Sequence, residues 1–349
     1  MYTCTFCVWE ECAIATRKDV AKLADVSEAT VSRVFNNVGP LREQTRLKVL
    51  QAAEQLNYTP NALAQSLVRR KSGNVGVVLP LLPKVHLFSS YYFSEILSGI
   101  GQTASERGYD TLLLYDRPDD APNYLRHIHT RKVDALILLG RRDTPSDRAA
   151  VSALVEQQLP VCLIGQRYEH LPVKTVDADH VNGSCALVSH LIALGRRRVA
   201  FINGPLHYSN SADRLLGYKL ALERHGIPYD PSLVLEGNFS RKSGYGLANT
   251  IARLAGRIDA VFAANDRMAV GLVRGLQSIG FPPGAGLVVA GYDNSELAQL
   301  GDPPLTSVEV PLFQMGQLAA NKLLDQVLGD DGEAQPFYER LPTRLIVRQ

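Results

Sequence analysis

Apolar residues recur at helical spacing through the first sixty residues, separated by short polar breaks. This pattern predicts three helices, at about residues 17–24, 28–36 and 44–56. Thr16 and Ser27 precede the first two helices and carry side-chain oxygens that can cap a first turn. Asn57 is expected to end the third in a left-handed conformation. The residues expected to face inward are Val20, Leu23 and Ala24, then Val31, Val34 and Phe35, and finally Leu47, Leu50, Ala53 and Leu56.

The second predicted helix has a polar outer face made of Glu28, Ala29, Ser32, Arg33 and Asn36. These are short side chains and one guanidinium that can reach base edges in a major groove. Two short helices joined by so brief a turn are typical of a helix-turn-helix. DNA binding is the preferred interpretation, and a small helical subdomain without a nucleic-acid role is the alternative.

From Gly73 onward, short apolar runs such as VGVVLP, DTLLLYD and DALILLG alternate with amphipathic stretches. Such alternation indicates parallel strands connected by helices. The segment exceeds one typical domain, so we expect two doubly wound lobes. Their ligand site is expected in the crevice at the carboxyl ends of the strands.

The charge distribution supports a polyanionic partner for the N-terminal part. The chain has 37 Lys and Arg against 35 Asp and Glu, a net charge of +2. Residues 16–72 contain ten Lys and Arg against five acids, so the basic excess belongs to this small unit.

The stretch TRKDVAKLADVSEATVSRVFNN, followed by TR at 45–46 and NYTPNALAQSL at 57–67, resembles the LacI/GalR family of bacterial transcription regulators. The resemblance implies a homodimer on double-stranded operator DNA. It implies base contacts from Glu28, Ala29 and Arg33, phosphate contacts from Ser27, Thr30, Ser32 and Thr45, and a structural or sugar-backbone role for Asn36. Arg42 departs from the family, which often has a capping Ser there.

The resemblance also implies a hinge helix in the linker. The run NALAQSLVRR is shorter than the ~12 to 15 residues at which an isolated helix becomes stable in water, so we expect it to fold only when two protomers pair it over DNA. Leu67 matches a side chain wedged into the minor groove, and Asn61 and Ala64 match positions of close approach. Without the family, Leu67 is equally an ordinary linker residue.

The implied fold is an all-α helix-turn-helix headpiece plus an α/β two-lobed body like that of periplasmic binding proteins, with two doubly wound parallel sheets. The chain is expected to cross between the lobes near 167, 296 and 333. The expected divisions are a disordered extension at 1–15, the DNA-binding domain at 16–60, the hinge and linker at 61–72, and an effector-binding and dimerisation domain at 73–349. Its N-lobe is expected at about 73–166 and 297–332, and its C-lobe at about 167–296 and 333–349.

Two charged residues match family positions that bind a small effector. Arg214 matches the arginine that grips the ligand, for which a salt bridge with a neighbouring acid is the alternative. Asp293 matches a carboxylate that can accept from vicinal hydroxyls, for which a role in ordering its loop is the alternative. Val310 stands where several sugar-responsive members have Gln, so one expected hydrogen bond is missing.

Aromatic and amide groups complete the expected effector site. Phe239 aligns with a ring that can stack on a sugar, and Tyr92 and Phe93 match an aromatic pair at the start of the first body helix; core packing is the alternative for all three. Asn265 is expected to point into the cleft, while Asp266 is expected to cap the following helix.

No catalytic motif, cofactor or metal site is expected. The sequence lacks a nucleophile elbow, a phosphate loop and an HExxH motif. Cys4 and Cys7 have metal-ligand spacing, but Cys12 is the one further cysteine nearby, and no histidine accompanies them.

The preferred functional interpretation is a cytoplasmic, nucleoid-associated regulator without membrane attachment, acting as a repressor of carbohydrate-utilisation genes with a sugar as effector. The alternatives are the same regulator with a purine or other non-sugar effector, and a solute-binding receptor, which would need export and no headpiece.

Overall fold

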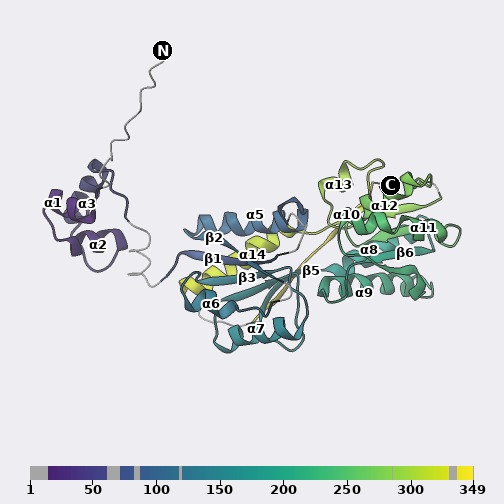
Figure 1. Ribbon diagram of the computed structural model, residues 1–349, viewed down its shortest axis with the longest axis horizontal. Coiled ribbons are helices and arrows are strands. Elements are labelled where there is room, and N and C mark those ends of the chain that lie inside the picture. The colour runs from purple at the N-terminus through teal and green to yellow at the C-terminus, as the bar shows by residue number, and fades with distance from the viewer. Residues whose placement is uncertain are drawn as a thin grey trace, which may run out of the picture. The chain divides into compact units, whose positions relative to one another are not determined.

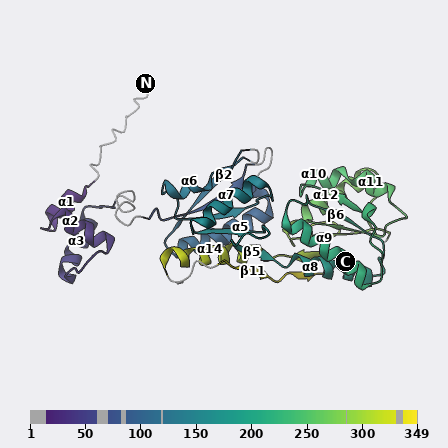
Figure 2. The same ribbon diagram turned by 90° about the horizontal axis from the view of Figure 1, so that it is seen from below.

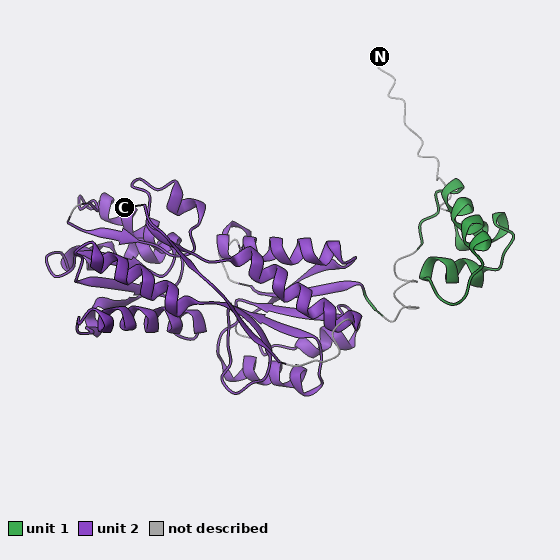
Figure 3. Ribbon diagram, turned by 180° about the vertical axis from the view of Figure 1, so that it is seen from behind, with its two compact units in different colours: residues 1–72 green, residues 73–349 purple. Residues whose placement is uncertain are grey.

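The computed structural model describes residues 15–60, 71–81, 87–117, 120–284, 286–329 and 336–348. The chain divides into two compact units, residues 1–72 and 73–349 (Figure 3). The extension before residue 15 lies outside the described residues. So do three predicted DNA contacts of the linker, Asn61, Ala64 and Leu67. No helix in the described ranges combines the length and the apolar character that crossing a membrane requires.

The first unit contains the three predicted helices, α1 (Arg17–Leu23), α2 (Glu28–Asn36) and α3 (Glu43–Gln55). Both predicted caps are confirmed. The Thr16 side chain accepts from the backbone N of Asp19, whose carboxylate accepts in return from the backbone N of Thr16, and the Ser27 side chain accepts from the backbone N of Thr30. Asn57 has a φ of +48°, as expected after α3. Local sequence therefore sets the ends of these helices.

Part of the predicted headpiece core is wrong. Val20, Val31 and Val34 are buried, but Leu23, Leu47 and Leu50 are 49%, 50% and 41% exposed. The buried residues of α3 are Val49, Ala52 and Ala53. Three short helices enclose a small volume, and one valine with two alanines lets α3 approach the other helices more closely than a row of leucines does.

The first lobe of the second unit is built on a six-stranded sheet in the order β11-β5-β4-β3-β1-β2, with every neighbouring pair parallel. Its strands are β1 (Asn74–Pro80), β2 (Asp110–Asp116), β3 (Ala135–Leu139), β4 (Val161–Ile164), β5 (Lys174–Ala178) and β11 (Tyr338–Leu341). Helices cover both faces (Figure 1). One face is covered by α5 (Tyr91–Glu106), which follows η1 (Leu87–Ser89), and α14 (Leu312–Leu328), and the other by α6 (Tyr124–His129) and α7 (Pro145–Glu156).

The second lobe has a four-stranded parallel sheet in the order β7-β6-β8-β9. Its strands are β6 (Val199–Asn203), β7 (Val234–Glu236), β8 (Ala260–Ala263) and β9 (Val288–Ala290), and the antiparallel pair β10 (Ser307–Glu309) and β12 (Arg344–Ile346) adjoins them. Its helices are α8 (His180–Ala193), α9 (Ser209–Arg224), α10 (Arg241–Gly246), α11 (Ala248–Arg253), α12 (Asp266–Ser278), α13 (Glu296–Gln299) and η2 (Pro231–Leu233). The predicted fold class is confirmed.

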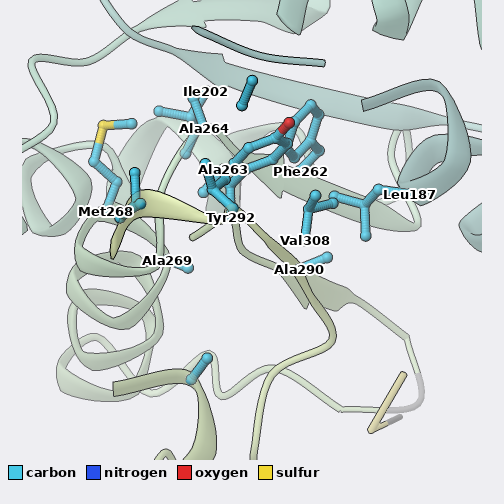
Figure 4. Close-up of a cluster of buried hydrophobic side chains, with 14 of the residues drawn as sticks. Leu187, Ile202, Phe262, Ala263, Ala264, Met268, Ala269, Ala290, Tyr292 and Val308 are labelled. Atoms are coloured by element: carbon cyan, nitrogen blue, oxygen red, sulfur yellow. The ribbon is translucent and has the colours of Figure 1, made fainter. Parts of the chain in front are cut away.

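The core of the second lobe contains the aromatic residues Phe262 and Tyr292 among aliphatic side chains (Figure 4). Phe262 of β8 is fully buried and stacks on Phe201 of β6 with ring centroids 4.4 Å apart. Tyr292, which follows β9, is also fully buried, and its ring centroid lies 6.1 Å from that of Phe262. The core therefore reaches from the middle of the sheet to the carboxyl ends of its strands.

The observed strand pairing places the three crossings between the lobes at positions that differ from the expected ones. β5 pairs with β4, and β11 pairs with β5, so both strands belong to the first lobe (Figure 2). The crossings consequently fall at Asp179, at residues 310–311 and at 342–343, each between elements of different lobes. The expected positions near 167, 296 and 333 are wrong. The β5 sequence KTVDA is buried throughout although two of its five residues carry charged groups, so it lacks the apolar run used to recognise strands.

Candidate functional site

The predicted DNA-contacting residues of the headpiece lie in α2 or at its N-cap, except Thr45, which lies in α3. Ser27, Glu28, Ala29 and Arg33 are exposed, so their side chains are accessible to a nucleic acid. The remaining predicted residues, Thr30, Ser32, Asn36 and Thr45, are partly buried. The arrangement suits a recognition helix with an open outer face.

Some of these side chains have local partners that define their role. The amide nitrogen of Asn36 donates to the backbone oxygen of Ser32 at 2.8 Å, which supports the structural role suggested for it. Arg42 occupies the N-cap position of α3, and its side chain makes no capping hydrogen bond with the described residues. A missing cap costs about 1 kcal/mol, and it leaves this exposed guanidinium free to approach a phosphate.

The predicted effector residues of the second lobe meet at one place. Arg214 of α9 and Asp293, which follows β9, are 3% and 8% exposed, and their Nη2 and Oδ1 atoms lie 3.8 Å apart. The guanidinium carbon of Arg214 lies 4.3 Å from the ring centroid of Tyr292 and 5.9 Å from that of Phe239. The Nε of Arg214 is buried without a hydrogen-bond partner among the described residues. The site therefore contains a buried guanidinium whose Nε–H group can still donate a hydrogen bond to a ligand.

Phe239 is held in an unusual backbone conformation beside this pair. Its φ is +63°, and its ring lies against Gly204, where a Cβ would come within 2.0 Å of the ring. Its ring also meets that of Tyr208 edge-on at 5.9 Å. A left-handed phenylalanine is costly, and such conformations cluster at binding sites.

The cap expected from Asp266 is instead made by its neighbour Asn265, which was expected to point into the cleft. Asn265 is the N-cap of α12, because its Oδ1 accepts from the backbone N of Met268 at 2.9 Å, and its Nδ2 donates to the carbonyl of Phe239 at 3.1 Å. Asp266 is buried and accepts from both Ser295 N and Ser295 Oγ. The cap must be extended, and Asn265, with φ −155° and ψ 162°, has that conformation. Asn265 therefore orients Phe239 and the helix.

The predicted aromatic pair of the first lobe lies at the start of α5. Tyr92 and Phe93 pack edge to face with centroids 5.1 Å apart. A Cβ at position 165 would lie 2.5 Å from the Tyr92 hydroxyl, and one at position 140 would lie 3.1 Å from the Phe93 ring. Both rings therefore lie over loops that follow strands. Burial raises the pKa of Tyr92, and charged groups of the second lobe also act on it.

The two lobes touch through Arg167 and Asp213, neither of which is among the predicted site residues. Arg167, which follows β4, donates from Nη2 and Nη1 to the two carboxylate oxygens of Asp213 at 2.8 and 3.0 Å. Its backbone N donates to Ser209 Oγ, and the backbone N of Ser209 donates to Gln166 Oε1, each at 3.1 Å. Asp213 directly precedes Arg214, so this contact is adjacent to the predicted ligand site. Position after a strand is the one sequence signal that marks Arg167.

Burial controls the protonation of the acids at this site. Burial raises the pKa of Asp293 to about 7, a shift that Arg214 opposes and Asp266 increases. Burial also raises the pKa of Asp266 to about 6, against the hydrogen bonds from Ser307 and Ser295. Near neutral pH, Asp293 can therefore be either an acceptor or a donor.

Comparison with known proteins gives matches in both units. The model of bacterial regulatory proteins of the lacI family matches residues 16–61, and that of the periplasmic binding protein-like domain matches residues 188–349. The HTH-type transcriptional regulator CelR of Thermobifida fusca is 34% identical over 96% of this chain and 97% of its own. DegA of Bacillus subtilis (strain 168), another HTH-type transcriptional regulator, is 32% identical over 85% of this chain and 87% of its own.

Two solved structures resemble the chain over nearly its whole length. A lac repressor dimer bound to operator and an anti-inducer has a TM-score of 0.82 at 28% identity, covering 96% of this chain and 98% of that one. A CelR complex with cellobiose has a TM-score of 0.70 at 32% identity, covering 96% and 99%. These relatives confirm the resemblance found in the headpiece sequence. The chain belongs to the lacI family of bacterial regulatory proteins and is a ligand-responsive, DNA-binding transcriptional regulator.

Proposed function

We propose that this protein is a dimeric repressor of carbohydrate-utilisation genes that binds a near-palindromic operator. A small sugar that acts as effector changes its affinity for this operator. The observation that carries the proposal is the buried Arg214–Asp293 pair, framed by the Tyr292 and Phe239 rings, in a chain that also has an exposed recognition helix. A guanidinium and a carboxylate together donate to and accept from hydroxyls, and an aromatic face packs on the C–H groups of a sugar.

Two comparisons support the partners in this proposal. The CelR structure contains cellobiose, and the lac repressor structure contains operator DNA and a dimer. We therefore assign operator contacts to Ser27, Glu28, Ala29, Thr30, Ser32, Arg33, Asn36 and Thr45, and effector contacts to Arg214, Asp293, Phe239, Tyr92 and Phe93. Asn265, whose side-chain atoms bond the backbone of Met268 and Phe239, positions the Phe239 ring instead of contacting the effector. The hinge contacts of Asn61, Ala64 and Leu67 stay predictions. No catalytic step or cofactor belongs to this function, and its place is the cytoplasm, where operator DNA is.

A purine or another non-sugar effector is the second candidate. The observation that favours it is Val310, which is 4% exposed and supplies no polar group where several sugar-responsive members have Gln. The Arg214–Asp293 pair can also recognise the ring N–H and carbonyl groups of a purine.

The mechanism follows from coupling between two sites on one chain. Two recognition helices read the half-sites, and the paired hinge segments hold the centre of the operator. An effector that favours one arrangement of the lobes changes the probability that the hinge pair forms. Because the coupling is thermodynamic, operator DNA must change effector affinity by the same factor.

A ligand screen tests the effector class. The full-length protein is melted in the presence of mono- and disaccharides, including cellobiose and ribose, and separately of nucleobases and nucleosides. A ligand present at 100 times its dissociation constant adds about 2.7 kcal/mol to the free energy of unfolding, a clear upward shift in Tm. Each compound that shifts the melt is then added to an operator mobility-shift titration. A shift with a purine and with none of the sugars contradicts the sugar proposal.

The affinity of a sugar found in this way is expected to rise with pH. The pKa of Asp293 is about 7, so this carboxyl is largely protonated at pH 6 and ionised at pH 8. The ionised form accepts hydrogen bonds from two hydroxyls, so binding favours loss of the proton. Kd should therefore fall between pH 6 and pH 8, by up to about tenfold per unit below the pKa. Isothermal titration calorimetry measures this, and Asp293→Asn, which cannot ionise, is the control expected to lose the dependence. Equal affinity at pH 6 and pH 8 in the wild type would contradict the role of Asp293.

A further inference from the structure

Two charged side chains meet where the first two helices of the headpiece begin. Arg17 is the first residue of α1, and Glu28 is the first residue of α2. The Nε of Arg17 donates to Oε2 of Glu28 at 3.1 Å. We propose that this pair reads one G·C base pair in each half of the operator, with Glu28 orienting the guanidinium of Arg17. The inference rests on the DNA-binding role proposed above and adds Arg17 to the residues that choose the sequence.

The atoms that remain available on the pair match the major-groove edge of G·C. Among the described residues, the two Nη groups of Arg17 and the Oε1 of Glu28 have no hydrogen-bond partner. Two Nη groups offer parallel donors to the O6 and N7 acceptors of guanine. The free carboxylate oxygen can accept from the N4 amino group of cytosine. One ion pair thus offers both the donors and the acceptor that this base pair requires.

The same pair contributes little to folding. The two side chains are 48% and 45% exposed, and ion pairs at such sites contribute about 0–1 kcal/mol to stability. The headpiece helices are held together by a separate apolar core that includes Val20, Val31 and Val49. Removing the pair should therefore change what the headpiece binds rather than whether it folds.

Charge explains why the two residues belong together on this surface. A lone carboxylate at the first position of a recognition helix would be repelled by the phosphates of DNA. Arg17 neutralises Glu28, and Glu28 in turn holds the guanidinium by its Nε, which leaves the two Nη groups for contacts with a base. Loss of Arg17 should both weaken binding and remove the preference for G·C at one position.

A selection experiment tests the inference with the full-length protein. Wild type, Arg17→Ala and Lys18→Ala each select duplexes from a randomised library, and affinities for the winning operator and its single-base variants are then titrated. We expect the wild type to prefer G·C at one symmetric position by about ten- to hundredfold, and Arg17→Ala to lose this preference while keeping the others. Lys18→Ala removes a neighbouring exposed positive charge and should lower affinity for all sequences alike.

A charge exchange separates base reading from ion pairing. The double variant Arg17→Glu with Glu28→Arg retains an ion pair but exchanges the donor and acceptor positions, so we expect it to select a different base pair. Thermal melts of all variants should stay close to the wild type. The inference is overturned if Arg17→Ala selects the same bases as the wild type, or if the charge exchange restores the wild-type choice. If the wild type itself selects no sequence, the proposed DNA-binding function fails instead.

Discussion

Arg214→Ala is expected to abolish the response of operator binding to the effector while leaving the operator affinity of the ligand-free protein near that of the wild type. Arg214 is 3% exposed, and within the part of the chain that the structure describes its Nε has no hydrogen-bond partner, so we expect the effector to supply one. Losing several hydrogen bonds to a charged group, each worth about 1.5–3 kcal/mol, weakens effector binding roughly a hundredfold or more. The headpiece forms a separate compact unit, so its DNA-contacting residues are unchanged.

Mobility-shift titrations with and without the sugar found in the screen measure this uncoupling. Arg224→Ala is the matched control, because Arg224 ends the same helix, α9, at an exposed position. It should keep both operator affinity and the effector response. A normal response in the Arg214 variant would leave that residue with only the ion-pair role that its 3.8 Å distance to Asp293 already allows.

Phe262→Ala is expected to destabilise the second lobe by about 3–5 kcal/mol. The ring is fully buried and stacks on Phe201 with ring centroids 4.4 Å apart, so truncation removes both apolar burial and a packed aromatic pair and leaves a cavity. For a unit of this size, each kcal/mol lowers Tm by roughly 2–4 °C, which gives a fall on the order of 10 °C.

Thermal denaturation followed by circular dichroism checks this value. Phe88→Ala is the control, because Phe88 is 59% exposed and its truncation should leave the melt almost unchanged. Effector binding by the Phe262 variant should fail at a lower temperature than in the wild type, since Tyr292, which lies against Arg214, packs in the same cluster. A Tm equal to that of the Phe88 variant would show that the surrounding core closes the cavity.

Features set by neighbouring residues were predictable from sequence. Thr16, Ser27 and Asn57 act through side chains or backbone angles within a few residues, and the structure confirms all three. Which face of α3 is buried depends on how closely three helices approach one another, and the larger leucines at 47 and 50 misled the prediction. The lobe crossings depend on which strands pair, and β5 pairs with β4 and β11 despite its charged residues.

The effector site could likewise be predicted from sequence only in part. Arg214, Asp293 and Phe239 could be named from sequence because they stand at family positions, Arg214 within α9 and the other two in loops that follow strands, and the structure brings them together. Asn265 and Asp266 are adjacent and both can cap a helix, so only their backbone angles separate the two roles. Arg167 and Asp213 are 46 residues apart, and nothing local marks them as partners.

The three crossings at Asp179, residues 310–311 and residues 342–343 tether the lobes at three points. A single connection would allow the lobes to separate or slide, whereas three connections restrict them mainly to rotation relative to each other. A ligand that binds between the lobes therefore shifts them along one defined motion. A substitution that made one connection more flexible would allow other motions and so weaken the coupling between effector and DNA, although it lies in neither binding site.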